Sequence, residues 1–494
     1  KRMKKIFIFV FFFASICYNV EAQENDNGIK AAGVATSLSE MYDWNLYPSY
    51  QTYLDFMNYY ADTYPNYCKL DTIGYTLNNR LLLALKISSD VSLDLNKPKF
   101  FYSSSMHGDE LTGSVILMHL IDTLLSSQSN DILALRDALQ IYICPLANPD
   151  GTYFGGDNNV SQAIRYNANY VDLNRNYPDI RAGIHPDGEA YQVENIAFMN
   201  YATREKFNMS CNLHGGAEVV NFPFDTYRSS QKTHADDSWF RTMGTEFVNS
   251  LSNASNYFVD VTSSGITEGG DWYVITGSRQ DWHTYFAHCR EVTLEISTTK
   301  TPSQNTLPRY WNYLKQSVFT FPLYCLKGFE GVVKDSITRD NLNDVMISIN
   351  NHDRDSSEVF TNNNGYFFRP ILAGEYSVTF SKQGYYDKTI NISASGNLTN
   401  IGEIELVAEN YNSLVLANGN SIKIFPVPAS DLLNIELEKD MEYMIADLQL
   451  KILKKGVLKK GNNLLDISFL NEGSYTLVFF DKNESISKQI IVVK

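Results

Sequence analysis

Two hydrophobic patterns follow one another along the chain. In residues 40–325, short apolar runs alternate with segments in which apolar residues recur at helical spacing. The apolar runs predict strands at 99–102, 140–144, 207–213 and 290–296, and the helical spacing predicts a helix over 111–126. Strands that alternate with helices favour an α/β domain with a mixed, mostly parallel sheet flanked by helices.

The pattern changes near residue 327, where short strand-like stretches take over. Val345, Ile347 and Ile349 recur at every second position, and the sequence Asn-Asn-Asn-Gly at 362–365 is typical of a hairpin turn. Residues 421–494 have the same texture and follow a predicted linker at 410–420. We therefore expect two small all-β sandwich domains after the α/β domain, at 327–408 and 421–494.

The first residues carry the pattern of a secretory signal peptide. Basic residues at 1–5 are followed by an apolar run at 6–16 and by Val20-Glu21-Ala22, a typical signal peptidase site. We predict a signal peptide over residues 1–22. No later run is apolar enough to cross a bilayer, so no transmembrane segment is expected in the mature chain.

Composition and charge narrow the choice of partner. The chain has 494 residues, with 41 Lys and Arg against 56 Asp and Glu, a net charge of −15. Residues 23–410 hold 27 basic and 45 acidic residues, a net charge of −18. This balance argues against nucleic acid and suggests a cationic ligand. Five cysteines follow the signal peptide without metal-knuckle spacing; we expect buried thiols, with one disulfide left open.

Two of the eight histidines end predicted strands. His107 is followed three residues later by Glu110 at the start of the predicted helix, and His214 precedes two glycines. Two imidazoles and one carboxylate leave the fourth position of a tetrahedral zinc site open for water, which is the catalytic arrangement. The His-x-x-Glu pair is weak evidence by itself, and the chain has no His-Glu-x-x-His segment.

Three further motifs make the pattern specific. They are Arg-Tyr-Asn-Ala at 165–168, Asp-Leu-Asn-Arg-Asn-Tyr-Pro-Asp at 172–179 and Glu-Val-Thr-Leu-Glu-Ile-Ser at 291–297. With them, residues 45–410 resemble the zinc metallocarboxypeptidases, most closely the carboxypeptidase D/E/N branch. The resemblance implies one Zn²⁺ per chain, with His107, Glu110 and His214 as its ligands, in a catalytic domain at 40–325.

The resemblance also implies two catalytic residues. Glu295 matches the general base that takes a proton from water, and Arg165 matches the arginine that stabilises the oxyanion. Period-two alternation puts Glu291, Thr293 and Glu295 on one face of their strand. A structural salt bridge is the alternative role for Glu295, and an exposed surface position is the alternative for Arg165.

The remaining implied residues bind the substrate. Arg175 with Asn174 would pair with a free C-terminal carboxylate, because a guanidinium binds a carboxylate through paired hydrogen bonds. Tyr273 matches a tyrosine that closes over the substrate, with plain core packing as its alternative role.

Two pocket residues bear on specificity. Asp225 and Gln280 match the pocket residues of the branch that removes C-terminal Lys or Arg. Arg279, next to Gln280 in the sequence, could instead neutralise Asp225.

The two β domains resemble known modules. Residues 327–408 resemble the transthyretin-like domain that follows this catalytic domain, through the segments 331–335 and 384–386. Residues 421–494 resemble the C-terminal sorting domain of type IX secretion, through the segments 424–429, 473–477 and 488–494. The second resemblance implies a secreted or cell-surface protein of a Gram-negative bacterium, with the secretion machinery as a partner. A generic sandwich or carbohydrate-binding domain is the alternative.

These expectations combine into one functional hypothesis. We expect a metallocarboxypeptidase that acts on peptide or protein C-termini and prefers Lys or Arg there. Because only about twenty residues separate the predicted cleavage site from the catalytic domain, we expect no inhibitory prodomain. Two alternatives stay open: an enzyme that trims cell-wall peptides, and a zinc-free adhesion or peptide-binding module.

Overall fold

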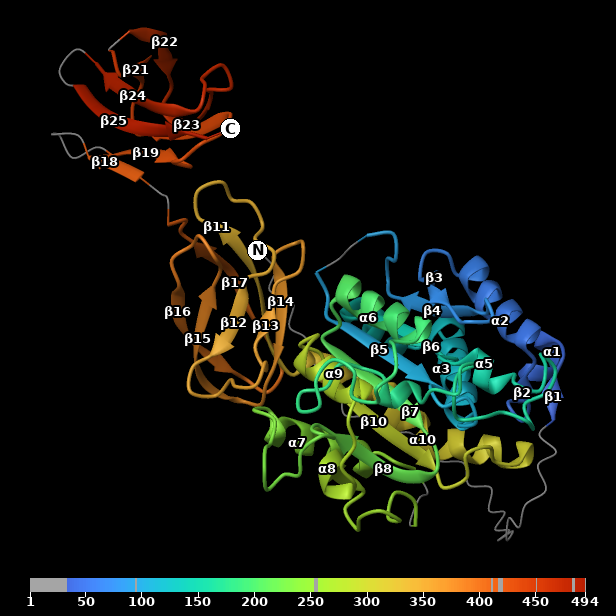
Figure 1. Ribbon diagram of the computed structural model, residues 1–494. Coiled ribbons are helices and arrows are strands. Elements are labelled where there is room, and N and C mark those ends of the chain that lie inside the picture. The colour runs from blue at the N-terminus through green and yellow to red at the C-terminus, as the bar shows by residue number, and fades with distance from the viewer. Residues whose placement is uncertain are drawn as a thin grey trace.

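A computed structural model describes residues 33–93, 96–252, 256–409, 412–415, 421–449, 451–481 and 485–493 (Figure 1). The predicted signal peptide at 1–22 lies outside these residues, as does most of the predicted linker. Residues 412–415 of that linker form a strand, β18 (Asn412–Val415), which pairs with the next strand of the last unit. In the part of the chain that is described, no helix combines the length and the hydropathy needed to cross a membrane.

The first unit is built on an eight-stranded sheet with the order β3-β4-β6-β5-β7-β10-β8-β9. Its strands are β3 (Cys68–Tyr75), β4 (Leu81–Ile87), β5 (Lys99–Ser104), β6 (Gln140–Cys144), β7 (Met209–His214), β8 (Ala217–Phe222), β9 (Ile266–Glu268) and β10 (Arg290–Ser297). The central strands β6, β5, β7 and β10 run parallel, whereas β3, β4 and β8 introduce antiparallel pairs. The predicted mixed, mostly parallel sheet is confirmed, and β5, β6, β7 and β10 are the four predicted strands.

Helices cover both faces of this sheet. One face packs against α2 (Tyr50–Thr63), α3 (Thr112–Ser126), α4 (Asn130–Ala138), α7 (Asp237–Asn249) and α10 (Leu307–Thr320). The other face packs against α6 (Val193–Glu205) and α9 (Arg279–Tyr285). Helix α3 confirms the predicted helix, and α9 begins after Ser278, whose side chain caps it by accepting the Asp281 N–H.

The central strands differ in character between their two faces. On β10, Val292, Leu294 and Ile296 join the apolar core under α3 and α10, while Glu291, Thr293 and Glu295 point to the other side. Strands β5 and β7 repeat this pattern, with Ser103 and Asn212 beside one another on the polar side. A row of buried polar side chains therefore runs across the middle of the sheet.

Short elements complete the first unit. They are β1 (Val34–Ala35), α1 (Leu38–Met41), β2 (Tyr47–Pro48), α5 (Pro149–Thr152), α8 (Gly269–Trp272) and the 3-10 turns η1 (Leu173–Arg175), η2 (Gln304–Thr306) and η3 (Phe321–Leu326). The five described cysteines are all buried and none forms a disulfide, which confirms that these thiols serve as small core residues.

The second unit is an all-β sandwich of two sheets. One sheet has the order β14-β11-β17 and the other β13-β12-β15-β16. Its strands are β11 (Gly328–Asp335), β12 (Met346–Ile349), β13 (Val359–Phe360), β14 (Tyr366–Pro370), β15 (Gly374–Ser381), β16 (Lys388–Ala394) and β17 (Leu398–Leu406). The predicted turn at 362–365 is present, but it joins β13 to β14, which lie in different sheets, so it is a crossing between sheets and not a hairpin.

The sandwich is joined to the first unit through buried charge. Asp236 accepts two hydrogen bonds from Arg369 of β14, at 2.9 and 3.0 Å, and two from Arg290 of β10, at 2.9 and 2.6 Å. All three side chains are fully buried. Because a buried charge without a partner is costly, these ion pairs favour one fixed docking of the two units.

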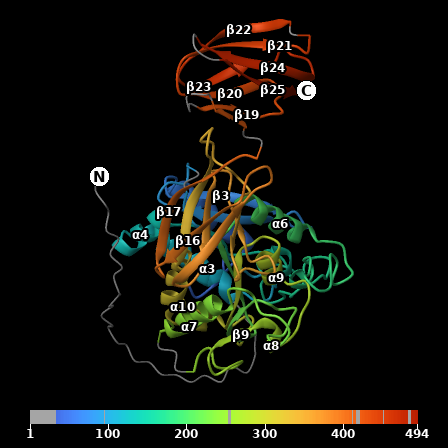
Figure 2. The same ribbon diagram turned by 90° about the vertical axis from the view of Figure 1, so that its left-hand side faces the viewer.

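The last unit is a second all-β sandwich with its own core. Its sheets have the orders β18-β19-β20-β23 and β22-β21-β24-β25. Its further strands are β19 (Ser421–Phe425), β20 (Leu432–Leu437), β21 (Met441–Ala446), β22 (Ile452–Leu458), β23 (Gly461–Asp466), β24 (Gly473–Phe480) and β25 (Ser485–Val492). Figures 1 and 2 both place this unit, in red, beyond the first sandwich and away from the central sheet. The expected all-β character of the chain after residue 327 is confirmed.

Candidate active site and metal centre

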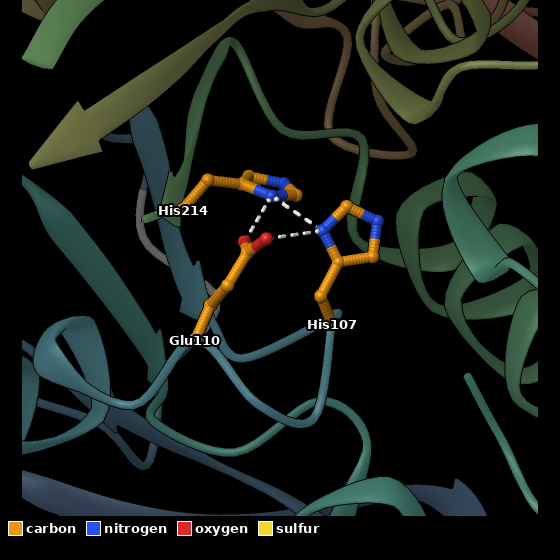
Figure 3. Close-up of side chains that lie close together, drawn as sticks. All are labelled: His107, Glu110 and His214. Carbon is orange, nitrogen blue, oxygen red and sulfur yellow. Dashed lines mark hydrogen bonds and ion pairs between the residues drawn. The ribbon is translucent and has the colours of Figure 1, made fainter. Parts of the chain in front are cut away.

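Three side chains converge at the carboxyl ends of β5 and β7. His107 follows β5, Glu110 precedes α3, and His214 is the last residue of β7. The Glu110 carboxylate lies between the imidazoles: its Oε1 is 2.9 Å from His107 Nδ1 and its Oε2 is 2.8 Å from His214 Nδ1 (Figure 3). The two Nδ1 atoms are 3.1 Å apart. Neighbouring parallel strands end at the same edge of a sheet, which brings these residues together.

The other ring nitrogen of each histidine has its own partner. His107 Nε2 lies 3.1 Å from Asp172 Oδ1, and His214 Nε2 lies 2.6 Å from the side-chain amide of Asn212. Contacts at Nε2 fix the orientation of each ring, so that Nδ1 faces Glu110. Both imidazoles therefore present the same atom to one point.

These residues fit a metal ion. One ligand atom from each of His107, Glu110 and His214 lies within 4.8 Å of the others, and all three residues are buried. Two imidazoles and a carboxylate with room for water are the donor set of a catalytic zinc site. A second group with metal-like spacing, Asp236 with His352 and Asp353, differs because arginines already occupy the Asp236 oxygens.

The local charges keep the ligand carboxylate ionised. Burial by itself would raise the pKa of Glu110, but His107 and His214 outweigh burial and hold this pKa well below its usual value. Lys300 Nζ adds a contact of 3.1 Å with Glu110 Oε1. The two imidazoles shift in opposite directions: burial lowers the pKa of His214, whereas Glu110 and Asp172 outweigh burial and raise the pKa of His107.

Glu295 lies next to this centre. In the parallel ladder it is the register partner of His214, and its side chain is largely buried. Its Oε2 has no hydrogen-bond partner among the described residues. Burial first, and then the charge of Glu110, raise the pKa of Glu295 well above its usual value. A buried carboxylate with a raised pKa is equipped to take up a proton.

A single cavity joins the sequence-predicted residues. Its volume is about 210 Å³, and its walls include the metal-binding group and Glu295 together with Arg165, Asn174, Arg175, Tyr273 and Asp225. Gln280, the tenth predicted residue, does not line the cavity but lies behind Asp225 and donates to it.

Asp172 organises one side of the cavity. Its Oδ2 accepts a hydrogen bond of 2.9 Å from Arg165 Nε, and its Oδ1 accepts the Asn174 N–H at 2.9 Å. Arg165 then lies 3.5 Å from Glu110 Oε1 and is partly exposed. Arg175 follows on the 3-10 turn η1 and donates to the Asn174 carbonyl at 2.8 Å. Two guanidinium groups therefore face the cavity from this segment.

Asp225 forms the other end of the cavity. Its side chain is 2% exposed, and its Oδ1 accepts from Asn221 Nδ2 at 3.2 Å and from Gln280 Nε2 at 3.1 Å. Burial raises the pKa of this carboxyl. A Cβ on Gly269 would lie 1.8 Å from Asp225 Oδ1, so only glycine allows this close approach.

Arg279 does not neutralise Asp225. Its guanidinium pairs with Glu291 at 3.1 Å on the far side of α9. Consecutive residues of a helix point about 100° apart, so Gln280 can face Asp225 while Arg279 faces the sheet. From the sequence, Arg279 could have neutralised Asp225; its position on α9 excludes this.

Three contact residues were missed from the sequence. Asp172 was part of a motif without an assigned role, Lys300 carried no signal, and Asn212 could have been found because it lies two residues before His214 on the same strand face. Tyr273, at the end of α8, is 46% exposed at the mouth of the cavity.

Comparison with known proteins agrees with this site. A family model described as zinc carboxypeptidase matches residues 53–317, and one described as secretion system C-terminal sorting domain matches residues 423–493. The chain is 31% identical to carboxypeptidase D of Mus musculus over 354 residues, 68% of this chain and 25% of that protein. It is 31% identical to the carboxypeptidase N catalytic chain of Rattus norvegicus, over 67% of this chain and 79% of that protein.

Among solved structures, carboxypeptidase A from Helicoverpa armigera aligns with a TM-score of 0.47 and 16% identity, over 56% of this chain and 73% of that chain. The chain spans about a quarter of the length of the carboxypeptidase D proteins that it matches. The zinc carboxypeptidase model, in contrast, covers more than half of this chain. The chain belongs to the zinc carboxypeptidase family.

Proposed function

We propose that this protein is a zinc-dependent exopeptidase that removes Lys or Arg from the C-termini of peptides and proteins. The observation that carries the proposal is the buried Asp225 carboxylate, which lines the same cavity as His107, Glu110 and His214. A cationic side chain would pair with Asp225, and a carboxylate would pair with the guanidinium groups on the opposite wall.

His107, Glu110 and His214 would hold one zinc ion. When bound there, zinc lowers the pKa of a water to about 7 and polarises the scissile carbonyl. Glu295 takes a proton onto its carboxylate from the attacking water and passes it to the nitrogen of the departing amino acid. The raised pKa of Glu295 supports both steps, because the carboxyl can hold the proton between them.

Arg165 and Arg175 would each bind a different negatively charged group of the substrate. Arg165, close to Glu110 and fixed by Asp172, would donate to the oxygen that becomes negative as water attacks. Arg175 and Asn174 would bind the C-terminal carboxylate of the substrate, which selects a chain end. Tyr273 would cover the bound residue from the mouth of the cavity.

The other units suggest where the enzyme acts. The match of residues 423–493 to a secretion sorting domain supports export through type IX secretion to the cell surface or the extracellular space of a Gram-negative bacterium. We infer that residues 1–22 are a signal peptide for the first export step. We also infer that the sandwich at 327–408 is a transthyretin-like domain that supports the catalytic domain through the buried ion pairs of Asp236.

The test is hydrolysis of blocked dipeptides that end in Arg, Lys, Leu, Phe or Glu, with and without a chelator. We expect chelator-sensitive release of Arg and Lys. The matched control is Glu295→Gln, which should keep zinc bound and lose turnover by about 10³-fold. Release of Leu or Phe in preference to Arg would overturn the specificity. No release of any residue would overturn the exopeptidase proposal and direct the search to cell-wall peptides.

A further inference from the structure

A buried chain of polar contacts lies behind the metal centre. We propose that the Arg279–Glu291 ion pair, acting through Ser103 and Asn212, positions the metal ligand His214. This inference rests on the proposed function only in that it takes His214 to be a zinc ligand. In this view Arg279 is a positioning residue that touches neither substrate nor metal.

The starting point is an arginine with no access to solvent. The Arg279 side chain is 0% exposed, and its guanidinium lies 5.1 Å from the ring centre of Phe101 and 5.4 Å from that of Phe198. It pairs with Glu291 at 3.1 Å. Removing two charges from water is costly, so a fully buried pair is held in place by its geometry and its remaining hydrogen bonds.

Glu291 is anchored from three sides. Its Oε2 accepts from Ser210 Oγ at 2.6 Å and lies 3.0 Å from His283 Nδ1, in addition to its contact with Arg279. Burial raises the pKa of Glu291, but Arg279 and His283 outweigh it and bring the pKa to about 2. The carboxylate therefore stays ionised and fixes the guanidinium.

From Arg279 the contacts continue to the metal ligand. Arg279 Nη1 donates to Ser103 Oγ at 2.6 Å, Ser103 Oγ donates to Asn212 Oδ1 at 2.9 Å, and Asn212 Nδ2 lies 2.6 Å from His214 Nε2. Ser103 and Asn212 are register partners on β5 and β7, so the path crosses the sheet on its polar face. Every distance in the path is that of a hydrogen bond.

The position of the proton on His214 decides which end of the Asn212 amide must face its ring. Binding a metal through Nδ1 leaves the proton of His214 on Nε2, which then needs an acceptor. The Asn212 oxygen becomes that acceptor when the amide turns over, and its Nδ2 then donates to Ser103 Oγ. Ser103 Oγ has two lone pairs, so it can accept from Arg279 Nη1 and from the turned Asn212 Nδ2 at the same time. The ion pair thereby holds Ser103 Oγ in place as a partner for the Asn212 amide in the orientation that a metal-bound His214 requires.

The two histidine ligands differ in the group that contacts Nε2. His107 has a carboxylate, Asp172, behind its Nε2, and a carboxylate accepts in any orientation. His214 has only an amide, which can present either a donor or an acceptor. The relay from Arg279 through Ser103 holds this amide in place next to His214.

The test compares two serines of the same network. Ser103 and Ser210 are both fully buried on neighbouring strands, and both hydroxyls reach the Arg279–Glu291 pair, but only Ser103 lies between this pair and Asn212. We would measure the zinc Kd of the full chain by competition with a chromophoric chelator. Ser103→Ala should weaken zinc binding by about ten-fold, while Ser210→Ala leaves it unchanged.

A rescue variant keeps the proposal falsifiable if the loss has a structural cause. Asn212→Asp supplies a carboxylate that accepts from His214 Nε2 without help from Ser103. In this background Ser103→Ala should no longer weaken zinc binding. Equal losses in the two serine variants, no loss in Ser103→Ala, or a loss that persists in the Asn212→Asp background would each overturn the relay.

The readout separates this inference from the proposed function. Zinc binding is measured without a peptide, so a protein that binds zinc and cleaves no peptide would fail as an exopeptidase while the relay could still be judged. Wild-type zinc affinity in Ser103→Ala would instead remove the relay and leave the exopeptidase proposal intact.

Discussion

The two ends of the cavity each hold a buried carboxylate, and the protein treats them in opposite ways. Glu110 is 4% exposed and lies against His107, His214 and the ammonium group of Lys300. Asp225 is 2% exposed, its side chain accepts from the Asn221 and Gln280 amides, and the Ser278 hydroxyl is a further neutral partner. One carboxylate is surrounded by groups that can carry positive charge, and the other is not.

The consequence is a pair of opposite pKa shifts. Burial acts on both groups, but His107 and His214 reverse its effect at Glu110 and lower that pKa, whereas burial prevails at Asp225 and raises its pKa. The same functional group is thus held ionised at the metal end, whereas at the other end the charge of Arg175 offsets burial only in part. This difference supports the proposal that the substrate brings a cationic side chain to Asp225.

Neutralising the metal-end carboxylate should have the largest effect. Glu110→Gln removes the charged ligand and leaves two imidazoles for the metal. We expect loss of bound zinc and loss of hydrolysis of every substrate down to background, since the water and the carbonyl then lack their activating ion. Metal analysis of the purified variant, together with the dipeptide panel, checks this. Retained zinc at wild-type affinity would contradict the assignment of Glu110.

Neutralising the other carboxylate should act on one substrate class only. Asp225→Asn keeps the shape of the pocket but removes the charge, so kcat/KM for Arg-ending dipeptides should fall by about 10²-fold. Zinc content and hydrolysis of Leu-ending dipeptides should stay the same, because the metal end is untouched. An equal loss for both substrates would mean that Asp225 supports the fold of the site and not its selectivity.

Most residues of the cavity and the strands that carry them could be predicted from the sequence. The alternation around Glu295 and the strand-end positions of His107 and His214 follow from the period of two and from the parallel order of β5, β7 and β10. The alternation of apolar and polar residues along β10 is visible in the sequence because one face of the strand packs in the apolar core and the other carries the polar residues of the site. Specific motifs supplied the remaining residues of the cavity.

The contacts that could not be predicted depend on which way a side chain or a loop points in the folded protein. The side of α9 on which Arg279 lies, and hence its partner Glu291, depends on where the helix meets the sheet. Likewise, Lys300 reaches Glu110 only because the chain turns back after β10. The turn at 362–365 was recognisable, but its crossing between two sheets depends on tertiary pairing.

The preference for Arg-ending over Leu-ending substrates should depend on pH. Since burial raises the pKa of Asp225, the carboxyl becomes neutral on acidification earlier than an ordinary aspartate does. The ratio of kcat/KM for Arg-ending over Leu-ending dipeptides should therefore fall as the pH drops below this raised pKa, by up to about ten-fold per pH unit. Protonation of groups at the metal end affects both substrates equally, so it does not change the ratio. The ratio in Asp225→Asn should be independent of pH. A flat ratio in the wild type would mean that the charge of Asp225 does not set the preference for Arg.

The smallest expected effect concerns stability. A carboxyl whose pKa is raised on folding binds its proton more tightly in the folded state, so stability falls as the pH rises from the usual range of aspartate through the raised pKa. At neutral pH the Asp225 charge therefore opposes folding, and Asp225→Asn should stabilise the full chain by about 1 kcal/mol. Thermal unfolding with saturating zinc checks this through a higher Tm for the variant. The gain should shrink as the pH is lowered, because both side chains are then neutral. A lower Tm at neutral pH would mean that the folded protein already compensates the Asp225 charge, and the two ends of the cavity would then be alike.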